Sequence, residues 1–178
     1  MLEALITSKT RVKLLLKFFL NADTSAYLRS LEPEFGESTN AIRLELNRFE
    51  AAGLLSSDSK GNRKYYQANT QHPLFPEINS LLMKYVGLDK IIEKVVSKLG
   101  GLETVYLVGQ LAKGNDSKII DLWFIGDGID KNFLLELIEK VESILERKVR
   151  YMIIKGQELQ DFLDTKSPSE LLLLWNKE

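Results

Sequence analysis

The sequence contains no cysteine, which excludes disulfide bonds, thiol nucleophiles and thiolate metal sites. Histidine is almost as scarce, because His72 is the only one in the 178 residues, so a multi-histidine metal site is excluded as well. His72 precedes Pro73, and we interpret it as a loop histidine without a catalytic role. Chemistry based on sulfur or on paired imidazoles is therefore not expected.

Long apolar runs are also absent. A membrane-spanning helix needs about 20 apolar residues, and no run approaches that length. The stretch Leu14–Leu20 is interrupted by Lys17, and Leu171–Trp175 is far too short. The N-terminus lacks the basic start and small-residue cleavage site of a secretory signal. We therefore expect a cytoplasmic protein that does not enter the membrane.

Neither sign of charge dominates. The chain has 24 Lys and Arg against 25 Asp and Glu, a net charge of −1, and a hydrophobic content of 44% that fits a globular fold. Residues 1–80 carry 10 basic and 9 acidic side chains, and residues 81–178 carry 14 and 16. Nucleic-acid binders usually have a clear excess of basic residues. Any nucleic-acid interface must therefore come from local placement of charge.

The order of the predicted elements indicates two small domains. The boundary signal is the segment 71–76, which contains two of the four prolines. Before it, apolar periodicity predicts helices over about 9–20, 24–30 and 38–52, with a turn at 31–36 between the last two, and then a hairpin. After it, we expect helices over about 76–85, 88–99 and 131–147, strands over about 104–108, 119–125 and 149–154, and two short helical stretches.

The third of these helices has two distinct faces. Ser38 is a good N-cap and Gly53 ends the helix. Ile42, Leu46 and Phe49 fall on one face, and Asn40, Arg43 and Asn47 fall on another. Arginine can bind guanine and asparagine can bind adenine, each through two hydrogen bonds. The polar face therefore suits base edges, although any surface helix has a solvated face of this kind.

A basic hairpin follows the helix. Gly61–Asn62 is a two-residue turn signal, and Lys60, Arg63 and Lys64 cluster around it. Such a hairpin is placed to contact a phosphate backbone.

Together these features resemble the winged helix-turn-helix of bacterial regulators related to the ArsR and MarR families. The run Asn40–Leu55 carries most of the likeness, which covers about residues 8–68. The family's metal-sensing cysteines are missing, so metal sensing is not expected. The resemblance implies binding of double-stranded DNA through the following residues: Thr39, Asn40, Arg43, Asn47, Lys60, Arg63 and Lys64.

The segment Val105–Gly126 resembles the minimal nucleotidyltransferase domain. That family's motif is Gly-Ser at the end of a strand, a turn with Ala and Gly, and Asp-x-Asp-Leu on the next strand. In such enzymes the two aspartates hold magnesium, and a third acid comes from a later strand. Magnesium requires hard oxygen ligands and neutralises phosphate charge.

The motif is only partly present. The matching positions are Gly109, Ala112, Gly114, Asp121 and Leu122. Gln110 stands where the serine should be, Ile119 stands where the first aspartate should be, and the strand over 149–154 has no acid. The resemblance therefore implies a retained fold without catalysis, with no catalytic residue, no metal and no cofactor. Gly109, Gln110 and Asp121 remain candidates for binding a nucleotide-like ligand. The alternative is an unrelated small α/β domain with a glycine-containing turn.

The sequence thus predicts an α+β protein, in which an N-terminal winged helix-turn-helix domain is followed by a small α/β nucleotidyltransferase-like domain. We expect a winged-helix DNA-binding domain over 1–75, a helical linker or dimerisation segment over 76–100, and the nucleotidyltransferase-like domain over 101–178. The main functional hypothesis is a sequence-specific DNA-binding transcriptional regulator that forms a homodimer and responds to a nucleotide-like effector. The alternatives are an active nucleotidyltransferase that uses the winged helix as a docking module, and a winged helix that binds a partner protein.

Overall fold

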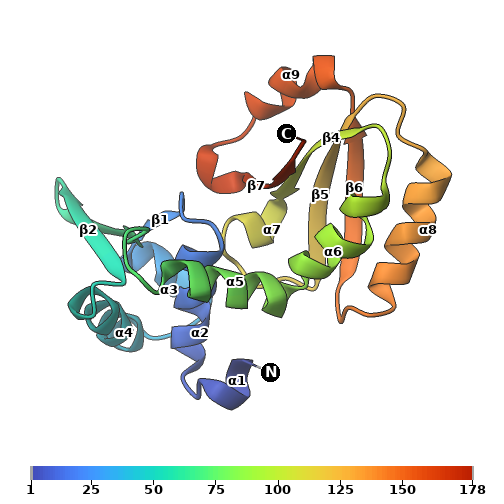
Figure 1. The fold of residues 1–178 in the computed structure, drawn as a ribbon. Coiled ribbons are helices and arrows are strands. Elements are labelled where there is room, and N and C mark those ends of the chain that lie inside the picture. The colour runs from blue at the N-terminus through green and yellow to red at the C-terminus, as the bar shows by residue number, and fades with distance from the viewer. Residues whose placement is uncertain (1, 178) are drawn as a thin grey trace. The chain divides into compact units, whose positions relative to one another are not determined.

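The computed structural model describes residues 2–177, which form two compact units that divide between Tyr85 and Val86 (Figure 1). Each unit has its own elements and its own core. No helix within the described residues is long and apolar enough to cross a membrane.

The first unit consists of helices around a three-stranded antiparallel sheet of order β1-β3-β2. Its elements are α1 (Leu2–Leu5), α2 (Lys9–Leu15), a π-helical turn (Leu16–Leu20), β1 (Ser25–Tyr27), α3 (Leu28–Phe35), α4 (Thr39–Ala51), β2 (Leu55–Lys60), β3 (Arg63–Ala68) and α5 (Phe75–Val86). The predicted hairpin is confirmed, because Lys60 pairs with Arg63 across the turn. The predicted cap is confirmed too, since Ser38 Oγ accepts a hydrogen bond from the Ala41 amide at 3.2 Å.

Two predictions for this unit are wrong. The helix expected over 24–30 is replaced by β1, which pairs with β3, and by the start of α3. The turn expected over 31–36 is helical through Pro33 and ends at Gly36, whose φ is 62°. Leu31 and Phe35 are both buried and lie one helical turn apart on either side of Pro33. Burial of this pair outweighs the local preference of proline for a helix end.

The core of the first unit is aromatic at its centre. Phe19 is fully buried, and its ring lies 6.3 Å from the ring of Phe49 and 5.9 Å from that of Phe75. Phe49 belongs to the apolar face of α4, and that face is buried as expected while Asn40, Arg43 and Asn47 are exposed.

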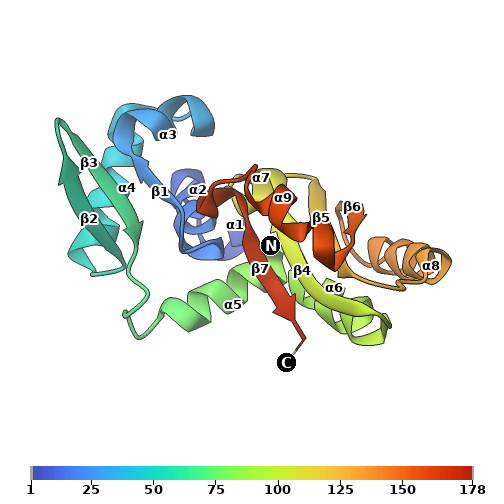
Figure 2. The same ribbon diagram turned by 90° about the horizontal axis from the view of Figure 1, so that it is seen from above.

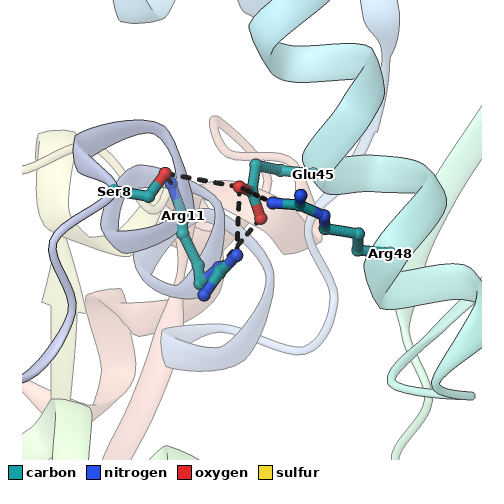
Figure 3. A network of polar contacts seen from close by, with 4 residues as sticks. All are labelled: Ser8, Arg11, Glu45 and Arg48. Carbon is teal, nitrogen blue, oxygen red and sulfur yellow. Dashed lines mark hydrogen bonds and ion pairs between the residues drawn. The ribbon is translucent and has the colours of Figure 1, made fainter.

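A buried carboxylate joins α2 to α4 (Figure 3). Glu45 on α4 is 4% exposed, and its Oε2 accepts a hydrogen bond from Arg11 Nε at 2.8 Å. Its Oε1 accepts bonds from Arg11 Nη2 at 3.1 Å and from Arg48 Nη1 at 2.9 Å. The carboxylate is thus taken out of water only because two guanidinium groups compensate its charge.

The second unit is built on a four-stranded mixed sheet of order β6-β5-β4-β7, in which only β5 and β6 are parallel among the described strands. Its elements are α6 (Leu88–Lys94), a 3₁₀ turn (Val96–Lys98), β4 (Leu102–Val108), α7 (Gly109–Ala112), β5 (Ile119–Gly126), α8 (Lys131–Glu142), β6 (Lys148–Ile154), a 3₁₀ turn (Gly156–Glu158), α9 (Leu159–Leu163), a 3₁₀ turn (Pro168–Glu170) and β7 (Leu172–Asn176).

Both faces of this sheet are covered. Trp123 and Ile154 belong to a cluster on one face, against which Leu159 and Phe162 of α9 pack. Helices α6 and α8 lie on the other side of the sheet from α9 (Figure 2). The mixed sheet with helices on both faces is an α+β arrangement of the kind that the nucleotidyltransferase resemblance implies.

Two boundaries in the second unit differ from the prediction. The helix expected over 131–147 ends at Glu142, and Ile144 beyond it is 59% exposed. The chain also closes with β7, which pairs with β4, where only helical stretches were expected. The apolar run Leu171–Trp175 is thus an edge strand.

Candidate functional site

The best-formed candidate site lies where β4, β5 and β6 come together. β4 ends at Val108, which pairs with Asp121 on β5, and Asp121 pairs in turn with Arg150 on β6. Gly109 then turns the chain into α7 with a φ of 72°. A Cβ at Gly109 would lie 2.5 Å from Asp121 Oδ2, so only glycine allows this approach. We call Gly109, Asp121 and Arg150 the Gly109 site.

The charge of the Gly109 site is balanced by an ion pair. The Asp121 side chain is 13% exposed, and Arg150 Nε donates a short hydrogen bond to its Oδ1. The Arg150 side chain is 71% exposed, and the carboxylate of Asp121 holds the pKa of its guanidinium above the ordinary value. The site therefore presents a cation to solvent over a mostly buried carboxylate.

Two other predicted positions lie beside this pair. Gln110 follows Gly109 and is exposed, and its Oε1 accepts a hydrogen bond from Asn115 Nδ2 at 3.0 Å. Ile119 is two residues before Asp121 on β5, hence on the same face, and is 39% exposed. The place of the first aspartate in the resemblance thus carries an apolar side chain near the surface.

A magnesium ion does not fit these residues. Within residues 2–177, no group of three or more His, Cys, Asp or Glu side chains could hold a metal ion. Asp121 is the one carboxylate of the Gly109 site, and the adjacent guanidinium already compensates its charge. A second cation there would be repelled by Arg150. The Gly109 site therefore suits an anion better than a divalent cation.

The loop after Gly109 is tied to the end of the chain. Lys113 Nζ lies 2.7 Å from Glu170 Oε1, and Glu170 also accepts hydrogen bonds from the backbone amide and hydroxyl of Ser167. The Lys113 bond, followed by the two Ser167 bonds, lowers the pKa of Glu170 to about 2. This contact fixes the segment before β7 against α7.

The residues predicted to bind DNA are only partly brought together. Arg43, Asn47, Arg63 and Lys64 line one cavity of about 730 Å³, together with Tyr27, Leu28, Arg29, Leu46, Asn62 and Tyr66. We call this the basic cavity. Thr39 and Lys60 are not among its lining residues, and neither is Asn40, which accepts a hydrogen bond from Arg43 at 3.2 Å.

The sequence did not indicate three of the residues that matter at these sites. Arg150 lies in the strand predicted over 149–154, in which the absence of acidic residues was the only feature noted from the sequence. Tyr27 and Arg29 were assigned to one short helix, although Tyr27 ends a strand and Arg29 is in the first turn of α3. Arg150 and Met152 fall on one face of the strand, and Tyr151 falls on the other. A charged residue on one face of a largely apolar strand is the one signal in the sequence for an arginine at the sheet surface.

No protein-family model matches the chain, and no curated protein matches it. Solved structures do. One is described as a candidate nucleotidyltransferase from Sulfolobus solfataricus; it is 24% identical, with 56% of this chain and 86% of that chain covered and a TM-score of 0.37. Two others are a toxin–antitoxin with AMP-PNP and a variant of the toxin–antitoxin MntA-HpeT. Both are 22% identical, with 51% of this chain and 73% of that chain covered and TM-scores of 0.39 and 0.40.

These comparisons contradict the main functional hypothesis. The three structures named above are described as a nucleotidyltransferase or a toxin–antitoxin, and none of them as a DNA-binding regulator. The prediction of a sequence-specific transcriptional regulator is therefore wrong, and the nucleotidyltransferase alternative is the better supported of the two. Two of the predicted DNA contacts are also occupied within the chain. Thr39 donates to Glu32 at 2.8 Å, and Lys64 donates to Glu50 at 2.7 Å.

Proposed function

We propose that residues 86–178 form a nucleotidyltransferase-like module that binds the phosphates of a nucleotide at the Gly109 site without a metal ion. The observation that carries this proposal is the position of Arg150 beside Asp121, the carboxylate that also lies next to Gly109. A guanidinium binds two phosphate oxygens at once, and it supplies positive charge that a magnesium ion would otherwise supply.

Each residue of the Gly109 site has a distinct part in this binding. Asp121 orients Arg150 through their hydrogen bond. Gly109 has no side chain that would collide with Asp121, so the turn stays close to the sheet. Gln110 adds an exposed amide next to the turn. The Arg150 side chain is exposed enough to exchange the carboxylate for a ligand phosphate.

Calorimetric titration of the full chain with ATP in EDTA tests this proposal. We expect binding in the absence of divalent cations, and about tenfold weaker binding at the Gly109 site in Arg150→Ala, because a charge-assisted hydrogen bond to phosphate is lost. Lys118→Ala is the matched control: it removes one exposed positive charge from the loop before β5 and should leave the affinity within about twofold. Equal affinities of the two variants would overturn the proposal.

The second candidate function is nucleotide transfer, which Asp121 favours because it stands at the position of the motif's second aspartate. An Asp121→Asn variant separates the two functions. Metal-free binding should persist in this variant, because the guanidinium that contacts phosphate is retained. Radiolabel transfer from ATP that requires Mg²⁺ and disappears in Asp121→Asn would identify the protein as an active enzyme instead.

For residues 1–85 we infer a winged helix, on the basis of the element order α2, β1, α3, α4, β2, β3 and the hairpin that follows α4. The homodimer also remains a proposal, with α5 as part of the interface because Leu74 before α5 and Leu81 on it are 54% and 37% exposed. Light scattering after gel filtration tests it. A monomeric mass at micromolar concentration would contradict the dimer, and Leu81→Lys should dissociate it.

A further inference from the structure

The basic cavity of the first unit concentrates positive charge. Of its ten lining residues, four are cationic, namely Arg29, Arg43, Arg63 and Lys64, and none is acidic. The buried side chains Leu46 and Tyr66 also line it. Its lining residues lie in β1, α3, α4, β3 and the turn between β2 and β3. Cations gathered in one hollow repel each other unless an anion compensates them.

Several of these cations are held in place. The Arg63 guanidinium lies 4.6 Å from the centre of the Tyr27 ring, and Arg43 donates a hydrogen bond to Asn40 at 3.2 Å. Lys64 is the one that an acid already neutralises, since its Nζ lies 2.7 Å from Glu50 Oε2. Three guanidinium groups therefore remain without a carboxylate partner among the described residues.

We propose that the basic cavity binds a compact polyphosphate, either inorganic or carried by a nucleoside. Planar guanidinium groups fit the oxygens of phosphate bidentately, and three of them match the three or more charges of a triphosphate. Asn47 and Asn62 add amide donors to the lining. The volume of about 730 Å³ lies within the usual range of small-ligand sites.

The distribution of charge favours a small anion over a long one. An extended nucleic acid needs a basic surface that follows its backbone, whereas here the cations converge on one cavity. The surroundings are acidic: Glu32 is bonded to Thr39 at the start of α4, Glu50 lies on α4, and Asp58 is exposed on β2.

The test is calorimetric titration of the full chain with sodium tripolyphosphate and, separately, with ATP, both in EDTA. Arg150→Ala serves as the background, because it reduces the contribution of the Gly109 site. In this background we expect the tighter site to be weakened about tenfold by Arg43→Ala and by Arg29→Ala. Arg29 is exposed and makes no hydrogen bond or ion pair within residues 2–177, so its loss should not disturb folding. Lys84→Ala on α5 is the charge-matched control and should change affinity less than twofold.

The separate titrations with tripolyphosphate and with ATP distinguish the two sources of phosphate. Equal affinities for tripolyphosphate and ATP indicate that the phosphate chain alone is bound, and tighter binding of ATP indicates a nucleoside polyphosphate. The proposal is overturned if neither binds, if Arg29→Ala and Lys84→Ala have equal affinities, or if a ten-residue glutamate peptide or a 12-base-pair duplex binds more tightly than both. The two proposals can fail separately. If the basic cavity binds no phosphate but the chain with Arg150 still binds ATP, the proposed function of the second unit is not contradicted.

Discussion

At Gly109 the backbone conformation and a close approach both require glycine. Its φ of 72° is in the left-handed region, and a Cβ would meet Asp121 Oδ2 at 2.5 Å. We predict that Gly109→Ala lowers the free energy of unfolding by about 2–4 kcal/mol, the sum of backbone strain and overpacking. Gly128→Ala is the matched control, since its φ is 76° but no atom lies within 4 Å of the added Cβ. That variant should lose only about 1 kcal/mol in urea unfolding. Equal losses would show that Asp121 does not restrict the turn.

Glu45 makes stability depend on pH. Burial, the largest effect, raises the pKa of Glu45, but the bonds from Arg11 and Arg48 together outweigh it and bring the pKa below the ordinary value. A carboxylate with a lowered pKa stabilises the fold above its unfolded pKa and loses that contribution as pH falls. We predict that Glu45→Gln costs about 1–3 kcal/mol at pH 7 and much less at pH 3, measured by urea unfolding.

Glu93 provides the comparison for Glu45. It is paired with Lys90 at 3.4 Å and with Lys94 at 2.8 Å, but its side chain is 55% exposed. Exposed pairs contribute little to stability because water screens them. Glu93→Gln should therefore leave unfolding almost unchanged at either pH. A loss as large as that of Glu45→Gln would mean that burial does not distinguish the two carboxylates.

Between elements, the Lys113–Glu170 contact fixes the segment before β7 to α7. The pKa of Glu170 is lowered to about 2 from 4.5, first by Lys113 and then by Ser167. We predict that Lys113→Met raises this pKa only part of the way to 4.5, because the two Ser167 bonds remain. A carbon-13 NMR titration of the glutamate carboxyl groups measures it. Lys166→Met, an exposed neighbour, should leave the titration in place. No response to Lys113→Met would show that Lys113 is not the main cause of the lowered pKa of Glu170.

Elements with strong local signals were predictable from the sequence. The α4 helix has a cap, an apolar face and a terminating Gly53, and the hairpin has a Gly61–Asn62 turn; both were found with nearly their expected bounds. The elements that were missed depend on distant partners. β1 is a strand because β3 offers it hydrogen bonds, and β7 is a strand because β4 does. Three- and five-residue segments carry too little periodicity to reveal such pairing.

Only the residues of the candidate site that are near each other in the sequence were predictable. Gly109 and Asp121 were singled out by their match to the nucleotidyltransferase motif, and β4 and β5 do bring them into contact. Arg150 joins them through the parallel register of β5 and β6, which places residues 29 positions apart side by side. No local pattern fixes the register of a crossover strand, so a single sequence gives no reason to pair Arg150 with Asp121.

Over the whole molecule, a net charge of −1 conceals the basic cavity and the exposed guanidinium of Arg150. At both places an acidic side chain forms an ion pair with one of the cations: Asp121 pairs with Arg150, and Glu50 pairs with Lys64. Composition therefore bears on solubility and long-range steering, whereas binding depends on which cations remain uncompensated.

The chain divides into two compact units, and both tryptophans, Trp123 and Trp175, lie in the second. Tryptophan fluorescence therefore follows only residues 86–178, while far-ultraviolet circular dichroism follows the whole chain. We predict that Leu46→Ala, at a position 1% exposed in the first unit, costs about 2–4 kcal/mol and moves only the dichroism transition in urea. Leu122→Ala, also 1% exposed but on β5, should shift the fluorescence transition together with the part of the dichroism change that comes from the second unit. If Leu46→Ala shifted both signals together, the chain would unfold as one cooperative body despite its two cores.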